Sequence, residues 1–434
     1  MSHAEEPRFA ALCNLDLNAV ARGRPFPIER LDAVLAEGLP WVPSNVCISA
    51  SNTIPPDNPF GPVGETKLVP ADVRPMILPV REDRPAMALY LADIRHHDGS
   101  FWQTCPRSQL ARALADLERQ HGLTLKAGFE HECYIYGLQD TPSGAYSLAG
   151  MRKGSGLAQD VQRTMASAGT RLEQFIPEFG VDQFEVSTPV ADALTAADHA
   201  VFAREAVRDG GRALGAHVTF APKPDVTQAG SGVHIHVSLW DTDGTPATAK
   251  EGALTAAGAA FTAGILKHLE AVMAYTTPSP NSFQRIAESS WVGVFACFGV
   301  RNREAAIRLC PRTPAGDGSH PGASLEFRLC DGASNPYLAL AALVRAGMMG
   351  LAEGLGAPES VEIDPARIDP ATREAAGHRR VPHALDTCLA AAEPLAADWF
   401  GPVFWQAYGA SRRNEINDAA AAGDAYPAQL SRIV

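Results

Sequence analysis

The sequence predicts an α+β protein of two domains, a small strand-rich one followed by a larger one that mixes helices and strands. Its 434 residues, 46% apolar and 20% charged, can bury a large core and exceed the usual size of a single domain. Short strand-like runs joined by proline-rich connections occupy residues 8 to about 100, and helical periodicity begins after Cys105. We therefore expect domains at 1–105 and 106–434.

The first domain is predicted from three strand-like runs, AALCNLDLNAV, MILPV and PAMALYLADI. Between the first two lies the connection NTIPPDNPFGPVGE. Its prolines lack the N–H groups that a strand ladder needs, so this stretch is expected to be a loop.

The second domain is expected to begin with a helix, because Leu110, Leu114 and Leu117 repeat at helical spacing and Gly122 provides a stop. Further helices are expected to alternate with short strands, as in α/β and α+β domains. Their approximate ranges are 157–176, 191–215, 252–275, 335–355 and 383–398.

Composition excludes several classes of function. A net charge of -12 leaves no basic stripe for nucleic acid. No apolar run reaches the roughly 20 residues that cross a membrane, and the first residues lack an apolar signal core, so we expect a cytoplasmic protein without a membrane partner. The eight cysteines include no C-x-x-C pair, which favours reduced thiols over structural zinc.

Three strand-like segments carry ionisable or polar side chains on one face only, because residues two apart on a strand point the same way. These residues are Glu130 and Glu132 in LKAGFEHECYIYGL, His234, His236 and Ser238 in GSGVHIHVSLW, and Glu326 and Arg328 in SLEFRLCDG. Each segment alone also fits a solvated edge strand or a pair of satisfied histidines. The repetition favours one cavity lined by all three polar faces, with the apolar faces packed under helices.

Two further segments add carboxylates and guanidinium groups. Glu178 and Glu185 flank a glycine in IPEFGVDQFEVSTP, and Arg301, Arg303 and Arg308 lie close together in RNREAAIRL. Carboxylates with a histidine suit Mg²⁺ or Mn²⁺, and arginines suit a transferring phosphoryl group. The chain has no G-x-x-x-x-G-K-[ST] loop, so a nucleotide must be held by another architecture.

The order of these motifs resembles the glutamine synthetase superfamily, and within it the γ-glutamylpolyamine and other glutamate–amine ligases, from LDLNAVARGR to RRNEI. FEHECYI, FIPEFGVDQFEV and GSGVHIHVSLW resemble the family's two glutamate pairs and its histidine strand. NSFQR, RNREAAIR and LEFRLCDGASNPYLALAAL resemble its glutamate-binding arginine, its phosphate-side arginines and its last ligand strand. The resemblance implies a β-grasp-like N-terminal domain and a catalytic domain whose curved antiparallel sheet lines a metal funnel.

The resemblance also implies a role for each matching residue. One metal would be held by Glu132, Glu178 and Glu185, and a second, nearer the nucleotide phosphates, by Glu130, His234 and Glu326. Glutamate would be bound by Gly230, Arg285 and Arg328. Arg303 would act at the transferring phosphoryl group of ATP, with Glu173, His236, Ser238 and Arg308 toward the nucleotide. The implied chemistry is formation of γ-glutamyl phosphate, which an amine then attacks.

The chain departs from true glutamine synthetases where ammonium would bind. Trp291 stands where their flap carries a glutamate, and the loop CISASNTI has no acid in the segment that should cross the subunit interface. A tryptophan binds alkylammonium by cation–π contact but accepts no proton, which favours a substituted amine. Glu288 is a candidate proton acceptor, and packing of Trp291 on a loop is the alternative to a role in the amine site.

A second departure is Ser324, which lies where the family usually has basic residues; Arg301 or Arg312 could compensate. The resemblance implies a homo-oligomer, a dodecamer of two hexameric rings. We therefore predict an ATP-dependent ligase that joins glutamate to a polyamine or small alkylamine. The alternatives are a glutamine synthetase that uses ammonia and a non-catalytic binding protein of the same fold.

Overall fold

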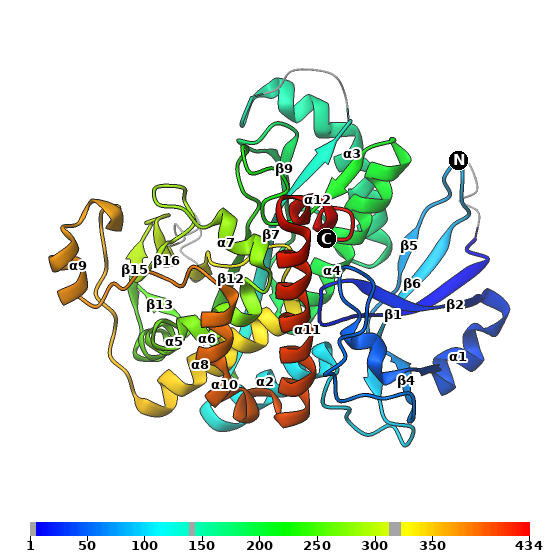
Figure 1. Ribbon diagram of the computed structural model, residues 1–434, viewed down its shortest axis with the longest axis horizontal. Coiled ribbons are helices and arrows are strands. Elements are labelled where there is room, and N and C mark those ends of the chain that lie inside the picture. Colours follow the sequence, from blue (N-terminus) through cyan, green and yellow to red (C-terminus); the bar gives the residue numbers. More distant parts are fainter. Residues whose placement is uncertain (1–5, 139–143, 312–322) are drawn as a thin grey trace.

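The computed structural model describes residues 6–138, 144–311 and 323–434, and it confirms the α+β fold class (Figure 1). A strand-rich N-terminal part lies beside a larger part built around a second sheet. Arg312, proposed above to compensate for Ser324, lies outside the described residues.

Six strands form the N-terminal sheet, in the order β2-β1-β6-β4-β3 with β5 beside β6. The strands are β1 (Phe9–Leu15), β2 (Ala21–Pro27), β3 (Leu39–Trp41), β4 (Thr66–Pro70), β5 (Met76–Leu78) and β6 (Met87–Arg95). Helix α1 (Leu31–Glu37) follows the β1–β2 hairpin, and β1 pairs in parallel with β6, as expected of a β-grasp-like domain. The first predicted run ends early because Asp16 accepts the N–H groups of Asn18 and Val20 and turns the chain.

The second sheet has nine strands in the order β15-β16-β17-β12-β7-β9-β8, with β10 and β11 also paired to β7. Its strands are β7 (Leu123–Tyr136), β8 (Gln174–Pro177), β9 (Gln183–Ser187), β10 (Ala191–Asp192), β11 (His217–Thr219), β12 (Val233–Asp241), β15 (Phe295–Val300), β16 (Ala305–Cys310) and β17 (Ser324–Phe327). All the pairs are antiparallel except β15 with β16. The two-residue strands β13 (Ala249–Lys250) and β14 (Ala253–Leu254) pair separately.

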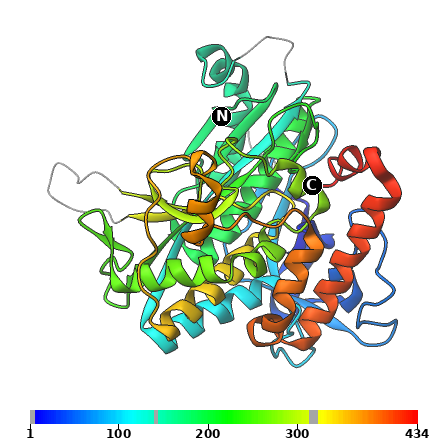
Figure 2. The same cartoon turned by 60° about the vertical axis from the view of Figure 1, so that its left-hand side comes forward.

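Helices pack against the apolar side of this sheet. The helices of the second part are α2 (Pro106–His121), α3 (Leu148–Ser167), α4 (Ala193–Ala213), α5 (Ala256–Lys267), α6 (Leu269–Thr276), α7 (Pro280–Arg285), α8 (Pro336–Glu353), α9 (Pro370–Ala375), α10 (Leu385–Phe400), α11 (Pro402–Ala422) and α12 (Tyr426–Leu430). The α4 helix contacts β7, and α2, α5 and α8 form a neighbouring layer (Figure 2). The face of β7 that carries Phe129, His131 and Cys133 is buried as a result.

Two predicted helices differ from the structure. The helix expected over 157–176 is α3, which begins at Leu148 and ends near Gly169, whose φ of +78° interrupts helical geometry. The residues after it pair as β8 with β9 instead. The helix expected over 252–275 is divided into α5 and α6 at His268, whose φ of -106° and ψ of 21° are not helical.

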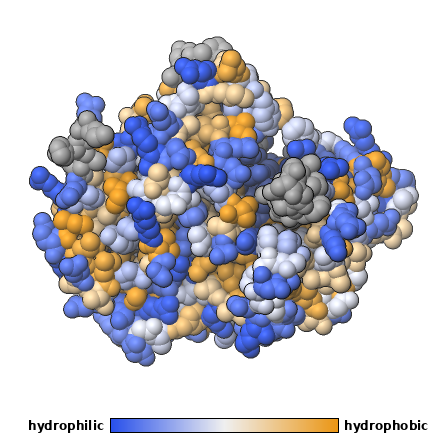
Figure 3. Space-filling view, turned by 180° about the vertical axis from the view of Figure 1, so that it is seen from behind, coloured by the Kyte–Doolittle hydropathy of each residue, from blue (hydrophilic) through white to orange (hydrophobic). Residues whose placement is uncertain are grey.

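The surface is mixed in character. On the face in Figure 3, hydrophobic residues are scattered among hydrophilic ones. None of the helices in the described ranges is long and apolar enough to cross a membrane.

The two parts are joined at the start of α8. Asn335 caps this helix by accepting the N–H groups of Tyr337 (3.0 Å) and Leu338 (3.3 Å), and its Nδ2 donates to the carbonyl of Asp16 (2.8 Å). Asn335 is buried, so water does not replace lost partners. One side chain therefore satisfies a helix end and holds the N-terminal part against it.

We expect Asn335→Ala to lower the free energy of unfolding by about 2–4 kcal/mol, from the lost cap and the unpaired carbonyl. Urea denaturation followed by tryptophan fluorescence measures the loss. Asn335→Ser is the matched control, because it keeps a capping oxygen but not the amide donor, and its loss should be smaller. Equal losses in the two variants would show that the cap contributes nothing.

Candidate active site

Strand register brings the predicted polar residues together on one face of the second sheet. Glu132 on β7 lies opposite Glu185 on β9, and Glu130 lies opposite His234 on β12. Two further pairs extend this row of polar residues across the sheet. His236 lies opposite Glu326 on β17, and Glu326 lies opposite Arg308 on β16. Side chains directly opposite on antiparallel strands have Cβ atoms about 4.5–5.5 Å apart. Residues from five strands thus form one row in which each lies within reach of its neighbour.

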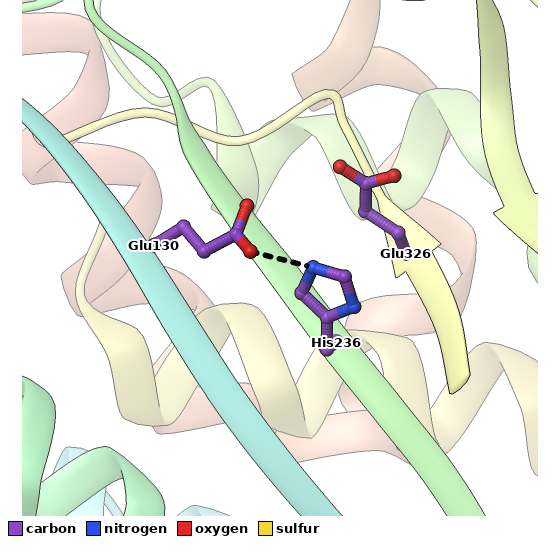
Figure 4. Close-up of side chains that lie close together, drawn as sticks. All are labelled: Glu130, His236 and Glu326. Carbon is purple, nitrogen blue, oxygen red and sulfur yellow. Dashed lines mark ion pairs between the residues drawn. The ribbon is translucent and has the colours of Figure 1, made fainter. Parts of the chain in front are cut away.

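The side chains at the centre of this row are close enough to share a cation. The His236 Nε2 atom lies 3.1 Å from Glu130 Oε1, and His234 Nδ1 lies 3.3 Å from Glu130 Oε2 and 3.8 Å from Glu326 Oε1. Figure 4 shows Glu130, His236 and Glu326 converging from three neighbouring strands. Two sets have ligand atoms within 4.8 Å of one another, Glu130 with His236 and Glu326, and Glu130 with Glu185 and His234.

The central row borders a cavity of about 800 Å³. All six proposed metal ligands line it, as do Trp291 and the residues proposed for glutamate and phosphoryl binding. These last residues are Gly230, Arg285, Arg303, Arg308 and Arg328. The sequence-based hypothesis that these side chains meet in one cleft is therefore in agreement with the geometry.

Charge is distributed unevenly across the cavity. Glu326 is buried and forms ion pairs with both Arg308 and Arg328. Burial opposes its ionisation, but the charges of His234, Arg328 and neighbouring groups outweigh burial and lower the pKa of Glu326. The β17 side of the site is therefore rich in cationic groups, which suits an anion such as phosphate.

The opposite side has an excess of carboxylates. Burial, followed by the charges of Glu130 and Glu132, raises the pKa of Glu185 to about 9. Burial and the charge of Glu132 raise the pKa of Glu178 to about 7. Within the described ranges, no lysine or arginine forms an ion pair with these acids, although Glu132 accepts the N–H of Gly232 (2.7 Å). A divalent cation would compensate this charge, and oxygen ligands suit Mg²⁺ or Mn²⁺.

Glu130 lies between the two sides. Burial opposes its ionisation, but hydrogen bonds and charges from His234 and His236 hold the pKa of Glu130 below its ordinary value. His236 was assigned to ATP on the resemblance, yet it lies as close to Glu130 as His234 does. Its Nδ1 atom is 3.1 Å from Ser324 Oγ, so Ser324 orients a residue of the site although it carries no charge.

Arg285 is held in place by backbone groups. It is buried, and its Nη2 donates to the carbonyl of Cys330 at 2.7 Å. A Cβ atom added at Gly230 would lie 2.3 Å from Arg285 Cγ, so only glycine lets the loop pass this close. Arg285 and Gly230, two of the residues proposed for glutamate binding, are therefore packed directly against each other.

Trp291 lies at the edge of the cavity in a constrained conformation. Its φ is +59°, its N–H donates to Glu304 Oε1 (2.8 Å), and its carbonyl accepts from Arg328 Nη2 (2.6 Å). Its ring contacts Phe179, and Phe179 contacts Tyr146. Tyr146 and Phe179 also line the cavity and were not singled out from the sequence. The position of Phe179 directly after Glu178 was the available signal.

Four proposed residues lie apart from the lining of the cavity, and one of them, His236, contacts Glu130 as described above. Glu288 forms an ion pair with Arg380, and Glu173 is exposed. Ser238 accepts a hydrogen bond from Trp240 Nε1 (2.9 Å) further along β12. The proton-accepting role of Glu288 stays a prediction, and it requires the carboxylate to leave Arg380.

Comparison with known proteins gives consistent results along the chain. Family models described as the glutamine synthetase N-terminal domain and the glutamine synthetase catalytic domain match residues 2–102 and 103–429. A relative named gamma-glutamylpolyamine synthetase GlnA3, from Streptomyces coelicolor, is 36% identical over 93% of this chain and 88% of its own length. A glutamine synthetase from Thermococcus kodakarensis is 29% identical over 88% of this chain and 83% of its own length.

A solved structure described as a novel glutamine synthase homolog superposes with a TM-score of 0.87 at 31% identity. The match covers 100% of this chain and 99% of the other. The fold and the sequence motifs therefore point to the same relatives.

We expect divalent cations to displace protons from the carboxylate side of the site. The pKa of Glu185 is about 9 in the folded protein, compared with an ordinary value of 4.5. The unfolded chain therefore releases this proton at lower pH than the folded protein does, and without a bound cation the folded protein loses stability as pH rises from about 4.5 to about 9. Cation binding offsets this loss, and affinity for Mn²⁺ should therefore rise between pH 6 and pH 9. Calorimetric titration in two buffers of different ionisation enthalpy counts the released protons.

Glu185→Gln is the control for this prediction. The variant keeps the size of the side chain but has no proton to lose, so proton release on Mn²⁺ binding should decrease. Unchanged proton release in Glu185→Gln, or a pH-independent affinity in the unmodified protein, would contradict the expectation.

Proposed function

This chain belongs to the glutamine synthetase family, and from that premise we propose that it is an ATP-dependent ligase joining the side-chain carboxylate of glutamate to an amine. The observation that carries the proposal is the uneven charge of the cavity, with carboxylates on one side of Glu130 and arginines on the other. Such a site suits phosphoryl transfer, in which cations and arginines neutralise phosphate charge.

Divalent cations would be held at two positions in this proposal, by Glu132, Glu178 and Glu185 and by Glu130, His234 and Glu326. The half-buried acids Glu178 and Glu185, with raised pKa values, support a cation at the first position. The short distances from His234 to Glu130 and Glu326 support the second. When bound, such ions withdraw charge from phosphate oxygens. His236 would orient Glu130 or add a further ligand.

The arginines divide into two groups by position. Arg285, fixed against Gly230, would hold glutamate, together with Arg328. Arg303 lines the same cavity and would stabilise the transferring phosphoryl group, with Arg308 on the nucleotide side. Attack by the side-chain oxygen of glutamate on ATP would then give γ-glutamyl phosphate and ADP, with Glu173, His236 and Ser238 toward the nucleotide.

The amine would enter at Trp291. This residue supplies a ring face and no carboxylate, which favours a substituted amine over ammonia. The relative from Streptomyces coelicolor, named as a polyamine ligase, supports an organic amine, whereas the relative from Thermococcus kodakarensis, named glutamine synthetase, keeps ammonia as the second candidate. A homo-oligomer of two hexameric rings remains part of the proposal.

The test is a panel of amines with glutamate, ATP and Mg²⁺, in which phosphate release and product mass are measured together. We expect organic amines to give γ-glutamyl amides with kcat/KM at least about tenfold above that for ammonia, since each apolar contact made in the transition state contributes. Faster turnover with ammonia would instead identify a glutamine synthetase. The absence of turnover with every amine would favour a non-catalytic binding protein.

We expect Trp291→Glu to lower kcat/KM for bulky amines by about tenfold or more and to affect ammonia less, because the variant removes a ring and restores a carboxylate. Trp291→Phe is the matched control, since it keeps an aromatic ring at the same position. Steady-state rates with each amine measure the effect. Equal losses for bulky amines and ammonia in Trp291→Glu would remove Trp291 from the amine site.

A further inference from the structure

We infer that the amine is a monoamine with an apolar alkyl or aryl tail, held by an aromatic rim of Tyr146, Phe179 and Trp291. This inference rests on the proposed function and sharpens it, because it selects one class among the candidate amines. A polyamine carries a second ammonium group along its chain, and the rim offers that group only weak cation–π contact with exposed rings, because the carboxylate that touches them, Glu178, belongs to the proposed metal site.

The three rings of the aromatic rim form a continuous surface. The Tyr146 and Phe179 ring centroids are 5.7 Å apart with planes at 80°, and those of Phe179 and Trp291 are 5.3 Å apart at 84°. Edge-to-face contacts of this kind leave ring faces free for a third group. About half of each side chain is exposed: 47% for Tyr146, 59% for Phe179 and 49% for Trp291. An apolar tail lying here would remove this surface from water.

The aromatic rim is anchored to the proposed reacting centre at both ends. At one end, the Tyr146 hydroxyl donates to the Glu178 carboxylate, at 2.9 and 3.0 Å from its two oxygens. At the other, the Trp291 carbonyl accepts from Arg328, which is paired with Glu326. An amine whose nitrogen lies among the carboxylates would therefore extend its tail across the rings. The distance between the nitrogen and the rim is set by residues already fixed to the site.

Apart from Glu178, the polar residues that line the cavity near the aromatic rim are neutral or cationic. Among the described residues that line the cavity, the carboxylates are Glu130, Glu132, Glu178, Glu185 and Glu326, all drawn from the sheet and the β8–β9 connection. The remaining polar lining nearer the surface consists of Lys223, Thr227, Gln228, Gln284, Ser289, Ser290 and Arg303. A second ammonium group on the tail would find no opposite charge in this outer lining, and the like charges of Lys223 and Arg303 would oppose it.

The acids closest to Trp291 along the neighbouring segments already have partners. Glu288 pairs with Arg380, Glu304 accepts the N–H of Trp291, and Asp364 accepts the hydroxyl of Ser289 at 2.9 Å. None of the three lines the cavity. Because they lie outside the lining, one of them could hold a distal ammonium only after moving toward the cavity. An uncharged tail needs no such rearrangement.

The decisive comparison uses butylamine and 1,4-diaminobutane, which have the same carbon chain and differ by one distal amino group. With glutamate, ATP and Mg²⁺, we expect kcat/KM to be at least about tenfold higher for butylamine, because the distal ammonium group would lose hydration at the rings without gaining a free counter-charge. Phenethylamine should also be accepted. Equal or better use of 1,4-diaminobutane overturns the inference and leaves the ligase proposal intact. No turnover with any amine overturns both.

A second measurement tests the aromatic rim itself through the ratio of kcat/KM for butylamine to that for methylamine, which has almost no tail. Phe179→Ala should lower this ratio about tenfold, since it removes the central ring. Val181→Ala is the matched control, because Val181 is exposed on the same connection and does not line the cavity. A ratio that changes equally in both variants, or in neither, would refute the role of the rim.

Discussion

The site depends on the antiparallel register of β7 with β9 and β12. This register places Glu132 opposite Glu185 and Glu130 opposite His234, so that carboxylates from separate strands point into one cavity. A shift of one residue would turn every one of these side chains toward α4 and bring Phe129 and Cys133 to the cavity. Burial of the apolar face therefore holds in place a polar face whose acids repel one another.

The repulsion between acids differs across the sheet, so one side of the cavity carries paired acids and the other carries acids without a counter-charge among the described residues. Glu326 is neutralised by Arg308 and Arg328, whereas burial and neighbouring carboxylates raise the pKa values of Glu178 and Glu185. Cations and anions are thus attracted to opposite sides of the same cavity. In the proposed reaction this arrangement would bring cations and phosphate together without either having to displace the other's ligands.

Arg328 connects the proposed glutamate and amine ends of the cavity. Its guanidinium group pairs with Glu326 and also holds the carbonyl of Trp291, and Glu304 fixes the N–H of the same residue. The φ of +59° at Trp291 is uncommon for a residue with a Cβ atom, and these contacts maintain it. In the proposed function, glutamate bound at Arg328 would therefore affect the position of Trp291 in the aromatic rim. This contact would couple the binding of the two proposed substrates.

Local patterns in the sequence determined which side chains share a face. Alternation along β7 and β12 is set by covalent geometry, so Glu130, Glu132, His234 and His236 could be grouped before any strand pairing was known. The tertiary structure decided their partners, because pairing joins residues far apart in the chain. Only it placed His236 beside Glu130, paired Glu288 with Arg380 and set Phe179 against Trp291. Long-range packing also turned the residues after α3 into β8, since β9 supplied hydrogen-bond partners that a helical pattern alone cannot predict.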